Sequence, residues 1–352
     1  LAGTLTVAPG TSATLRGTWS NGGSIAINSG TLVLDGTFSL STLGSFSNAN
    51  GIVSIIGTLN NASGLTLNAA TGSWSVTGGT ITGGTIAQTQ GSRLLFGSNT
   101  DSTLNGVTFD SPLRVSGTNA RVRALGTTAP AYSIESSGAS IGFEPGRVLN
   151  QTVTVNSVGT AALETVGSGS LTIGPSGRVE VLSGSFTLGS FWYSGTRSLL
   201  IQGTIENAGG AVTLNPTVLT NYDAATQTLT GGTYRLLNGS IMSFPAPIAR
   251  FNATLVADGI NGLPTQLFGM SENLGTITLT GGKVAAILNA QGQPTTFTNR
   301  GRINIGPGSS LRVGTAGRSA NFVQDAAGTV RFDLAGTTTS TLTFGTKSTT
   351  YA

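Results

Sequence analysis

One stretch of this sequence occurs twice, and that repetition constrains the fold more than any other feature. Residues 57–67 (GTLNNASGLTL) return with few changes as residues 203–214 (GTIENAGGAVTL). In both copies, a turn rich in Asn and Gly leads into a short apolar alternation. These two residue types adopt positive φ or hydrogen-bond their own backbone most easily. Because an internal repeat dictates the architecture, the sequence predicts one structural unit used many times.

A second repeated phrase joins pairs of strands through proline. Residues 5–15, 171–181 and 303–313 each place a Pro-containing turn between two alternating apolar runs. Proline lacks the N–H that a central strand needs, so these prolines are predicted to lie at corners. A Gly-Thr pair followed by an apolar residue begins at positions 17, 36, 57 and 79, in steps of 19, 21 and 22 residues. Strands and corners that recur about every 20 residues are typical of a β-solenoid.

We therefore predict an all-β fold, a single-stranded, right-handed parallel β-helix (β-solenoid) of about 15 to 17 coils. The right hand rests on the general preference for right-handed crossover connections and on the family resemblance given below. Residues 1–352 are predicted to form one continuous solenoid, with irregular excursions around residues 99–135 and 216–275. Because the chain begins with Leu1 rather than Met, we expect it to be part of a longer precursor. Period-two alternation predicts that Leu214 points inward and Thr213 outward.

Composition excludes several kinds of chemistry. The chain has no His and no Cys, so Ser-His-Asp catalysis, Cys-His catalysis and ordinary zinc sites are excluded. We predict no catalytic, cofactor-binding or metal-binding residue, and no enzymatic activity. The net charge is +4, but aromatic residues do not interleave with the basic ones, so nucleic acid is not an expected partner. No apolar run approaches the roughly 18 residues of a membrane helix, so no transmembrane segment is expected.

Four residues are candidates for contact with a glycan. Asp101 and Asp110 lie in the first irregular region, and some β-helices cleave polysaccharides with paired acids. The alternative for each is an aspartate that caps a turn. Trp192 and Tyr193 belong to an aromatic run in which strand alternation turns at least one side chain outward, as a platform for a sugar ring. The alternative there is a core tryptophan beside a tyrosine at a corner.

Several segments between about residues 215 and 335 carry a family resemblance. They are residues 222–223 (YD), 227–234 (QTLTGGTY), 275–282 (GTITLTGG), 297–303 (FTNRGRI) and 322–324 (FVQ). They resemble the long repetitive β-strand proteins of bacterial surfaces, the autotransporter-passenger and filamentous-haemagglutinin-like right-handed β-helices. The resemblance implies export, an extracellular location and a structural or adhesive role.

These observations predict a non-enzymatic structural or adhesive segment of a secreted bacterial cell-surface or extracellular fibre protein. Expected partners are further copies of the chain, stacked head to tail into a filament, and a surface polysaccharide or a host or neighbouring cell. The alternative is a polysaccharide-binding or polysaccharide-cleaving β-helix protein. Thr-x-Thr pairs, as at residues 80–82 and 276–280, add ice binding as a weaker alternative, since their spacing along the sequence is irregular.

Overall fold

The computed structural model describes residues 2–192, 197–259, 263–287, 295–314, 320–333, 339–344 and 347–350. Strands and two short 3-10 turns account for the regular structure in this part of the chain, which has no α-helix. The strands stack in parallel as coils of a β-solenoid of about 14 turns, which confirms the predicted fold class. There are fewer turns than the expected 15 to 17 because some coils are long, such as the one of 29 residues between Glu206 and Arg235.

Contacts divide the chain into two compact units, which we describe separately. Unit 1 comprises Leu1–Pro145 and Asn156–Gly167, and unit 2 comprises Gly146–Val155 and Ser168–Ala352. Strand β21 (Thr152–Thr165) supplies residues to both.

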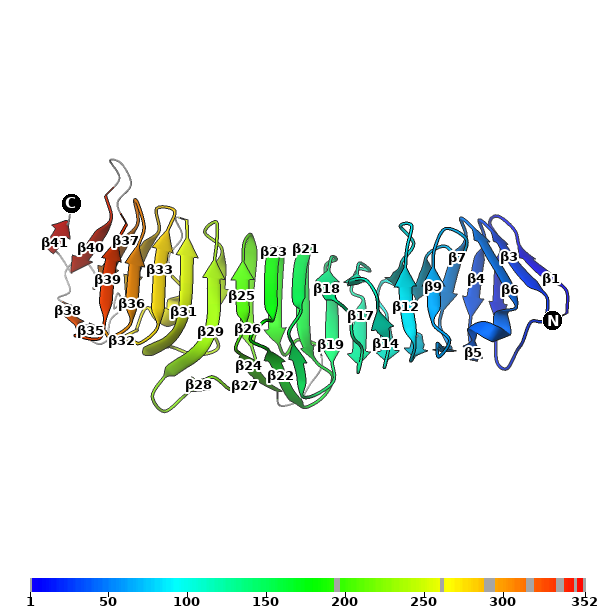
Figure 1. Ribbon diagram of the computed structural model, residues 1–352, viewed down its shortest axis with the longest axis horizontal. Coiled ribbons are helices and arrows are strands. Elements are labelled where there is room, and N and C mark those ends of the chain that lie inside the picture. The colour runs from blue at the N-terminus through cyan, green and yellow to red at the C-terminus, as the bar shows by residue number, and fades with distance from the viewer. Residues whose placement is uncertain are drawn as a thin grey trace. The chain divides into compact units, whose positions relative to one another are not determined.

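Unit 1 is built from rows of short parallel strands, drawn from blue to blue-green in Figure 1. The first row is β1 (Thr4–Val7), β3 (Ser24–Asn28) and β6 (Ser45–Ala49). The second is β2 (Ser12–Leu15), β4 (Thr31–Leu34), β7 (Ile52–Ile55), β10 (Trp74–Val76) and β13 (Leu94–Phe96). The third is β9 (Leu65–Leu67), β12 (Thr85–Gln88) and β15 (Thr108–Phe109). The fourth is β5 (Thr37–Ser39), β8 (Thr58–Asn60), β11 (Thr80–Thr82), β14 (Asp101–Asn105), β17 (Arg121–Leu125) and β19 (Ala139–Phe143). Strand β16 (Leu113–Val115) pairs with β18 (Ala131–Ile134), and the 3-10 turn η1 spans Leu40–Leu43.

Unit 2 repeats this arrangement with longer coils, drawn from green to red in Figure 1. One row is β20 (Arg147–Leu149), β22 (Gly169–Ile173), β24 (Arg197–Ile201) and β27 (Val218–Leu219). The longest is β23 (Arg178–Gly189), β25 (Thr204–Asn207), β29 (Thr228–Leu236), β31 (Arg250–Asp258), β33 (Thr276–Thr280), β36 (Arg302–Ile305) and β39 (Thr329–Phe332). Beside it lie β26 (Gly210–Asn215) and β30 (Ile241–Ser243), and further along β32 (Glu272–Asn273), β35 (Thr296–Asn299) and β38 (Asn321–Gln324). The last row is β34 (Val284–Ile287), β37 (Ser310–Val313), β40 (Thr341–Phe344) and β41 (Lys347–Thr350), the final pair being antiparallel.

Inward side chains stack into continuous apolar columns. In unit 1 the fourth row places these buried residues in register: Phe38, Leu59, Ile81, Leu104, Ala124 and Phe143. The longest row of unit 2 does the same with Val179, Ile205, Tyr234, Leu255, Ile277 and Ile303. Burial of one such side chain contributes about 1.5 to 3 kcal/mol, so the columns are the main source of stability of each unit.

The phrase that occurs twice in the sequence makes the same structure both times. Each copy is a strand, a corner with a buried asparagine, and a second strand: β8 and β9 around Asn61, and β25 and β26 around Asn207. Asn61 Nδ2 donates to the carbonyl oxygens of Gly83 and Thr85, at 3.1 and 3.2 Å, and Asn207 Nδ2 donates to that of Ile241 at 2.6 Å. Each corner asparagine therefore binds its own coil to the next one.

The glycine that begins the phrase is required by close approach of neighbouring coils. A Cβ atom at Gly57 would collide with the carbonyl oxygen of Gly36, and one at Gly203 with that of Gly177. The proline phrases lie at turns, as predicted: the N–H of Thr11 bonds Ala8 O at 3.1 Å across the turn that contains Pro9.

The two intervals that look irregular in sequence differ from each other in the structure. Residues 99–135 continue the parallel coils through β14, β16, β17 and β18, because their charged side chains point outward and bond between coils. Residues 216–275 contain features that interrupt the parallel stack. Strand β28 (Tyr222–Asp223) pairs antiparallel with β29, the register shifts between Thr230 and Thr233, and a 3-10 turn, η2, spans Thr265–Leu267.

Candidate functional site

The outward faces of the coils carry the polar groups that any function would use. Strand alternation sends every second side chain outward, and parallel register places that side chain beside its counterpart about 4.8 Å away on the next coil. Charged residues on these faces bond across coils, and small hydroxyl residues form columns.

Glu206 is the most shielded carboxylate of an outward ion-pair cluster in unit 2. Its side chain is only 6% exposed. One carboxylate oxygen accepts Arg178 Nη2–H and the other accepts Arg235 Nε–H, each at 2.6 Å. Arg178 lies on β23 and Arg235 on β29, the strands on either side of β25. Glu206 therefore joins three successive coils, and Glu180, on the first of them, approaches Arg178 at 3.3 Å.

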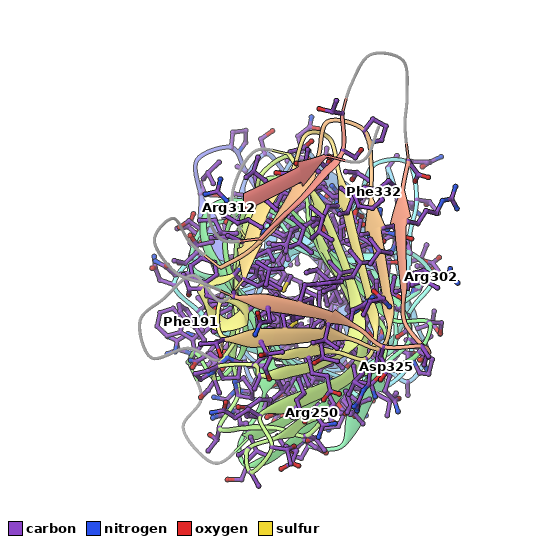
Figure 2. The ribbon with its side chains drawn as sticks, turned by 90° about the vertical axis from the view of Figure 1, so that its left-hand side faces the viewer. Phe191, Arg250, Arg302, Arg312, Asp325 and Phe332 are labelled. Atoms are coloured by element: carbon purple, nitrogen blue, oxygen red, sulfur yellow. The ribbon has the colours of Figure 1, made fainter. Side chains whose placement is uncertain are left out.

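A second cluster on unit 2 follows the same design. Glu272 is paired with Arg250 at 2.6 Å and with Arg300 at 2.9 Å. Arg300 also bonds Asp325 at 3.2 Å. The N–H of Ala327, which donates to Asp325 Oδ1, lowers the pKa of that carboxyl, and the charge of Arg300 lowers it further. Figure 2 shows Arg250 and Asp325 on the outside of the coils.

Asp101, one of the predicted glycan contacts, is held in an ion pair between coils. It is half-buried on β14, and both carboxylate oxygens accept from Arg123 of β17, from Nε at 3.0 Å and from Nη2 at 2.6 Å. Such a bidentate pair fixes both side chains and occupies the carboxylate.

Asp110, its predicted partner, lies on another sheet of the same unit. It directly follows β15, is exposed, and accepts the Gln88 N–H through Oδ1 at 3.2 Å. Nine residues of a solenoid coil pass a corner, so the two aspartates belong to different rows of strands. The structure does not bring Asp101 and Asp110 together as a carboxylate pair.

The aromatic run is exposed where the structure describes it. Phe191 and Trp192 are 40% and 42% exposed, and their rings meet edge to face with centroids 5.0 Å apart. The chain bends at these residues, so strand alternation does not govern them, and both rings face outward. Phe191 lies at the periphery in Figure 2. Tyr193 lies outside the described residues.

Outward threonine side chains stack into columns on unit 1. Thr37, Thr58, Thr80 and Thr103 stand in register on the fourth row of unit 1. Two positions further along the same strands, a second outward column holds Ser39, Asn60, Thr82 and Asn105. The spacing of Thr-x-Thr pairs along the sequence is irregular, but the Gly-Thr steps already held the signal for the first column.

One cavity on unit 1 has the size of a catalytic cleft but presents no acid–base group. A cavity of about 570 Å³ on unit 1 is lined by Asn48, Ser73, Ser75 and neighbouring residues, none of which is ionisable. Within the described ranges, no three Asp or Glu side chains gather as metal ligands. Nor does any described helix have the length and apolar character needed to cross a membrane.

Comparison with known proteins adds no homologue. No family model, no curated protein and no solved structure matches the chain.

Proposed function

We propose that this chain is a non-enzymatic structural and adhesive module of a secreted bacterial surface or extracellular fibre protein. The observation that carries the proposal is Glu206, a nearly buried carboxylate that bonds arginines of the two adjacent coils. Charged residues used in this way hold coils together. The resemblance to autotransporter-passenger and filamentous-haemagglutinin-like β-helices supports the same role and an extracellular location. The proposal includes head-to-tail assembly of copies, which electron microscopy of the purified protein would reveal as filaments.

The alternative of a polysaccharide-cleaving β-helix requires two carboxyl groups that face one another across the sugar. Retaining and inverting glycosidases place them about 5 to 10 Å apart. Asp101 is occupied by Arg123, and Asp110 lies on a different sheet. These positions favour the structural role over glycan cleavage.

The test is to remove the charge of Glu206 without changing its shape. Glu206→Gln removes the negative charge and replaces one of the two acceptor oxygens with an NH2 donor, so we expect the free energy of unfolding to fall by about 1.5 to 3 kcal/mol. Glu180→Gln is the matched control: it lies on the adjacent coil, is more exposed, and within the described ranges its one ion pair is the 3.3 Å contact with Arg178. Its expected loss is below about 1 kcal/mol. Both are measured by urea denaturation.

The same variants test the enzymatic alternative. Wild-type protein incubated with acidic and neutral polysaccharides is expected to leave their chain length unchanged. The structural proposal would be refuted if the wild-type protein shortened the polysaccharide chains and if Glu206→Gln, Glu180→Gln or Asp101→Asn abolished this activity.

A second candidate function is binding of ice or of another ordered, hydroxyl-rich surface, and the paired columns on unit 1 favour it. Their spacing is about 4.8 Å between coils and about 6.7 Å between alternate residues of a strand. If this face binds ice, Thr58→Lys at its centre should abolish thermal hysteresis. Thr66→Lys, on the exposed side of β9 in another row, should retain it. Absence of thermal hysteresis and of ice shaping in the wild-type protein would rule this function out.

A further inference from the structure

A small basic pocket on unit 1 lies beside Asp110, between two neighbouring coils. Its volume is about 270 Å³, below the roughly 300 to 1,000 Å³ of pockets for drug-sized ligands. The turn after β12 and the segment that joins β15 to β16 form its walls, with Ser92, Arg93, Ser111 and Arg114 among the lining residues. The pocket therefore has room for one sugar-sized group.

Both charged residues that line the pocket are arginines. No carboxylate belongs to the lining. Arg114 donates to Glu135 through Nε at 2.6 Å, and its terminal nitrogens have further N–H groups with which to bond a ligand. Arg93 forms no ion pair within the described part of the chain. Two guanidinium groups on adjacent coils, one of them not neutralised, favour an anionic ligand.

The polar floor of the pocket is held in place before any ligand arrives. Gln88 Oε1 accepts the Leu94 N–H at 2.8 Å, and Gln88 Nε2 donates to Ser111 Oγ at 2.8 Å. Because Ser111 Oγ is the acceptor in this bond, its own proton is free to bond an anion. Because this donor is already fixed beside two guanidinium groups, less side-chain entropy is lost when a ligand binds.

We propose that this pocket binds the anionic group of an acidic polysaccharide, a carboxylate or a sulfate ester carried by one sugar. Arg93 and Arg114 supply the charge, and Ser111 supplies a hydrogen bond. Hydroxyl and amide groups in the lining match the hydroxyls of a sugar. A nucleic acid fits less well, because no aromatic side chain lines the pocket to stack on a base. The structural role proposed above does not depend on this site.

Asp110 modulates the site from its edge. Its carboxylate bonds the Gln88 backbone beside the pocket without lining it, so its negative charge opposes an incoming anion. The residue that the sequence suggested as a catalytic acid thus acts in this proposal as a repulsive neighbour. Removal of its charge should therefore strengthen binding.

The test measures binding of the whole chain to polygalacturonate, dextran sulfate and uncharged dextran. We expect binding to the charged polymers, weakening as salt is raised, and none to dextran. Arg93→Gln should weaken binding about five- to tenfold, and Asp110→Asn should strengthen it about twofold, both being effects of one charge at close range. Preference for polygalacturonate identifies a carboxylate ligand, and preference for dextran sulfate identifies a sulfate ester.

The matched control is Arg16→Gln, which removes the same charge from an exposed site on unit 1 outside the pocket. It should keep wild-type affinity within about twofold. Equal losses in the Arg16 and Arg93 variants would show that only overall charge matters and would overturn the proposal. Tighter binding of a single-stranded oligonucleotide than of either polysaccharide would overturn it as well. Asp110→Asn is expected to raise the affinity, whereas misfolding would lower it. A gain in this variant therefore cannot be caused by misfolding.

Discussion

Replacing Leu214 with aspartate is expected to lower the free energy of unfolding of unit 2 by about 4 kcal/mol or more. Leu214 is 2% exposed on β26 and stands in register with Leu188 of β23. A carboxylate at this position would lose its water and stand in register with the buried, apolar Leu188. The loss of apolar burial adds about 2 kcal/mol to that cost. Urea denaturation followed by circular dichroism measures the change.

Thr213→Asp is the control for the same change on the opposite face. Thr213 is exposed, and its neighbours in register are Thr187 and Ser243, which are hydroxyl residues. A carboxylate there keeps its water, so we expect a change within about 0.5 kcal/mol. Comparable losses in the two variants would contradict the facing of β26, and an unaltered Leu214→Asp protein would contradict the role of the apolar column.

The facing of Leu214 and Thr213 could be predicted from the sequence because it depends only on strand geometry. Successive side chains of any strand point to opposite sides, so an alternating run is sufficient evidence. The corner at Pro9 could be predicted equally well, since proline lacks the N–H that a central strand needs. The number of coils was harder to predict. The long coil before Arg235 includes the antiparallel pairing of β28 with β29, and no periodic pattern in the sequence indicates that pairing.

The ion pairs between coils were not predicted, although the spacing needed for them is present in the sequence. Asp101 and Arg123 are 22 residues apart, close to one of the Gly-Thr steps, and they pair on adjacent coils. Asp101 and Asp110 are closer in sequence but lie on different rows. In a solenoid, separation by one coil length brings side chains together, and separation by half a coil does not.

Replacing Lys283 is expected to change the free energy of unfolding substantially, because its ammonium group is buried without a hydrogen-bond partner among the described residues. The residue directly precedes β34, its side chain is fully buried, and Nζ has no hydrogen-bond partner within the described part of the chain. Burial lowers the pKa of Lys283, and the charge of Asp258 only partly opposes this. Lys283→Met keeps an unbranched side chain as far as the Cε position and removes the unsatisfied donor. We expect the free energy of unfolding at pH 7 to rise by about 1 to 3 kcal/mol.

The dependence of this gain on pH identifies its cause. Since the pKa of Lys283 is lowered in the folded protein, the unfolded chain binds more protons between that pKa and the ordinary value of 10.5. Wild-type stability therefore contains a term that rises with pH over this interval, and the Met variant lacks it. The advantage of Lys283→Met should be larger at pH 7 than at pH 10 and shrink as pH approaches 10. Tyrosine ionisation affects both proteins alike and cancels in the difference.

Arg312→Met provides the control for loss of one positive charge. Arg312 is exposed on β37, the strand that pairs with β34. Its removal changes net charge by the same amount but relieves no buried donor, so we expect a change within about 0.5 kcal/mol at every pH. If the advantage of Lys283→Met were constant from pH 7 to 10, the gain would not come from burial of the charge. If Lys283→Met destabilised the protein, the ammonium would have a partner in solution. Lys283 would then be part of the hydrogen bonding between coils, in the same way as Asn207.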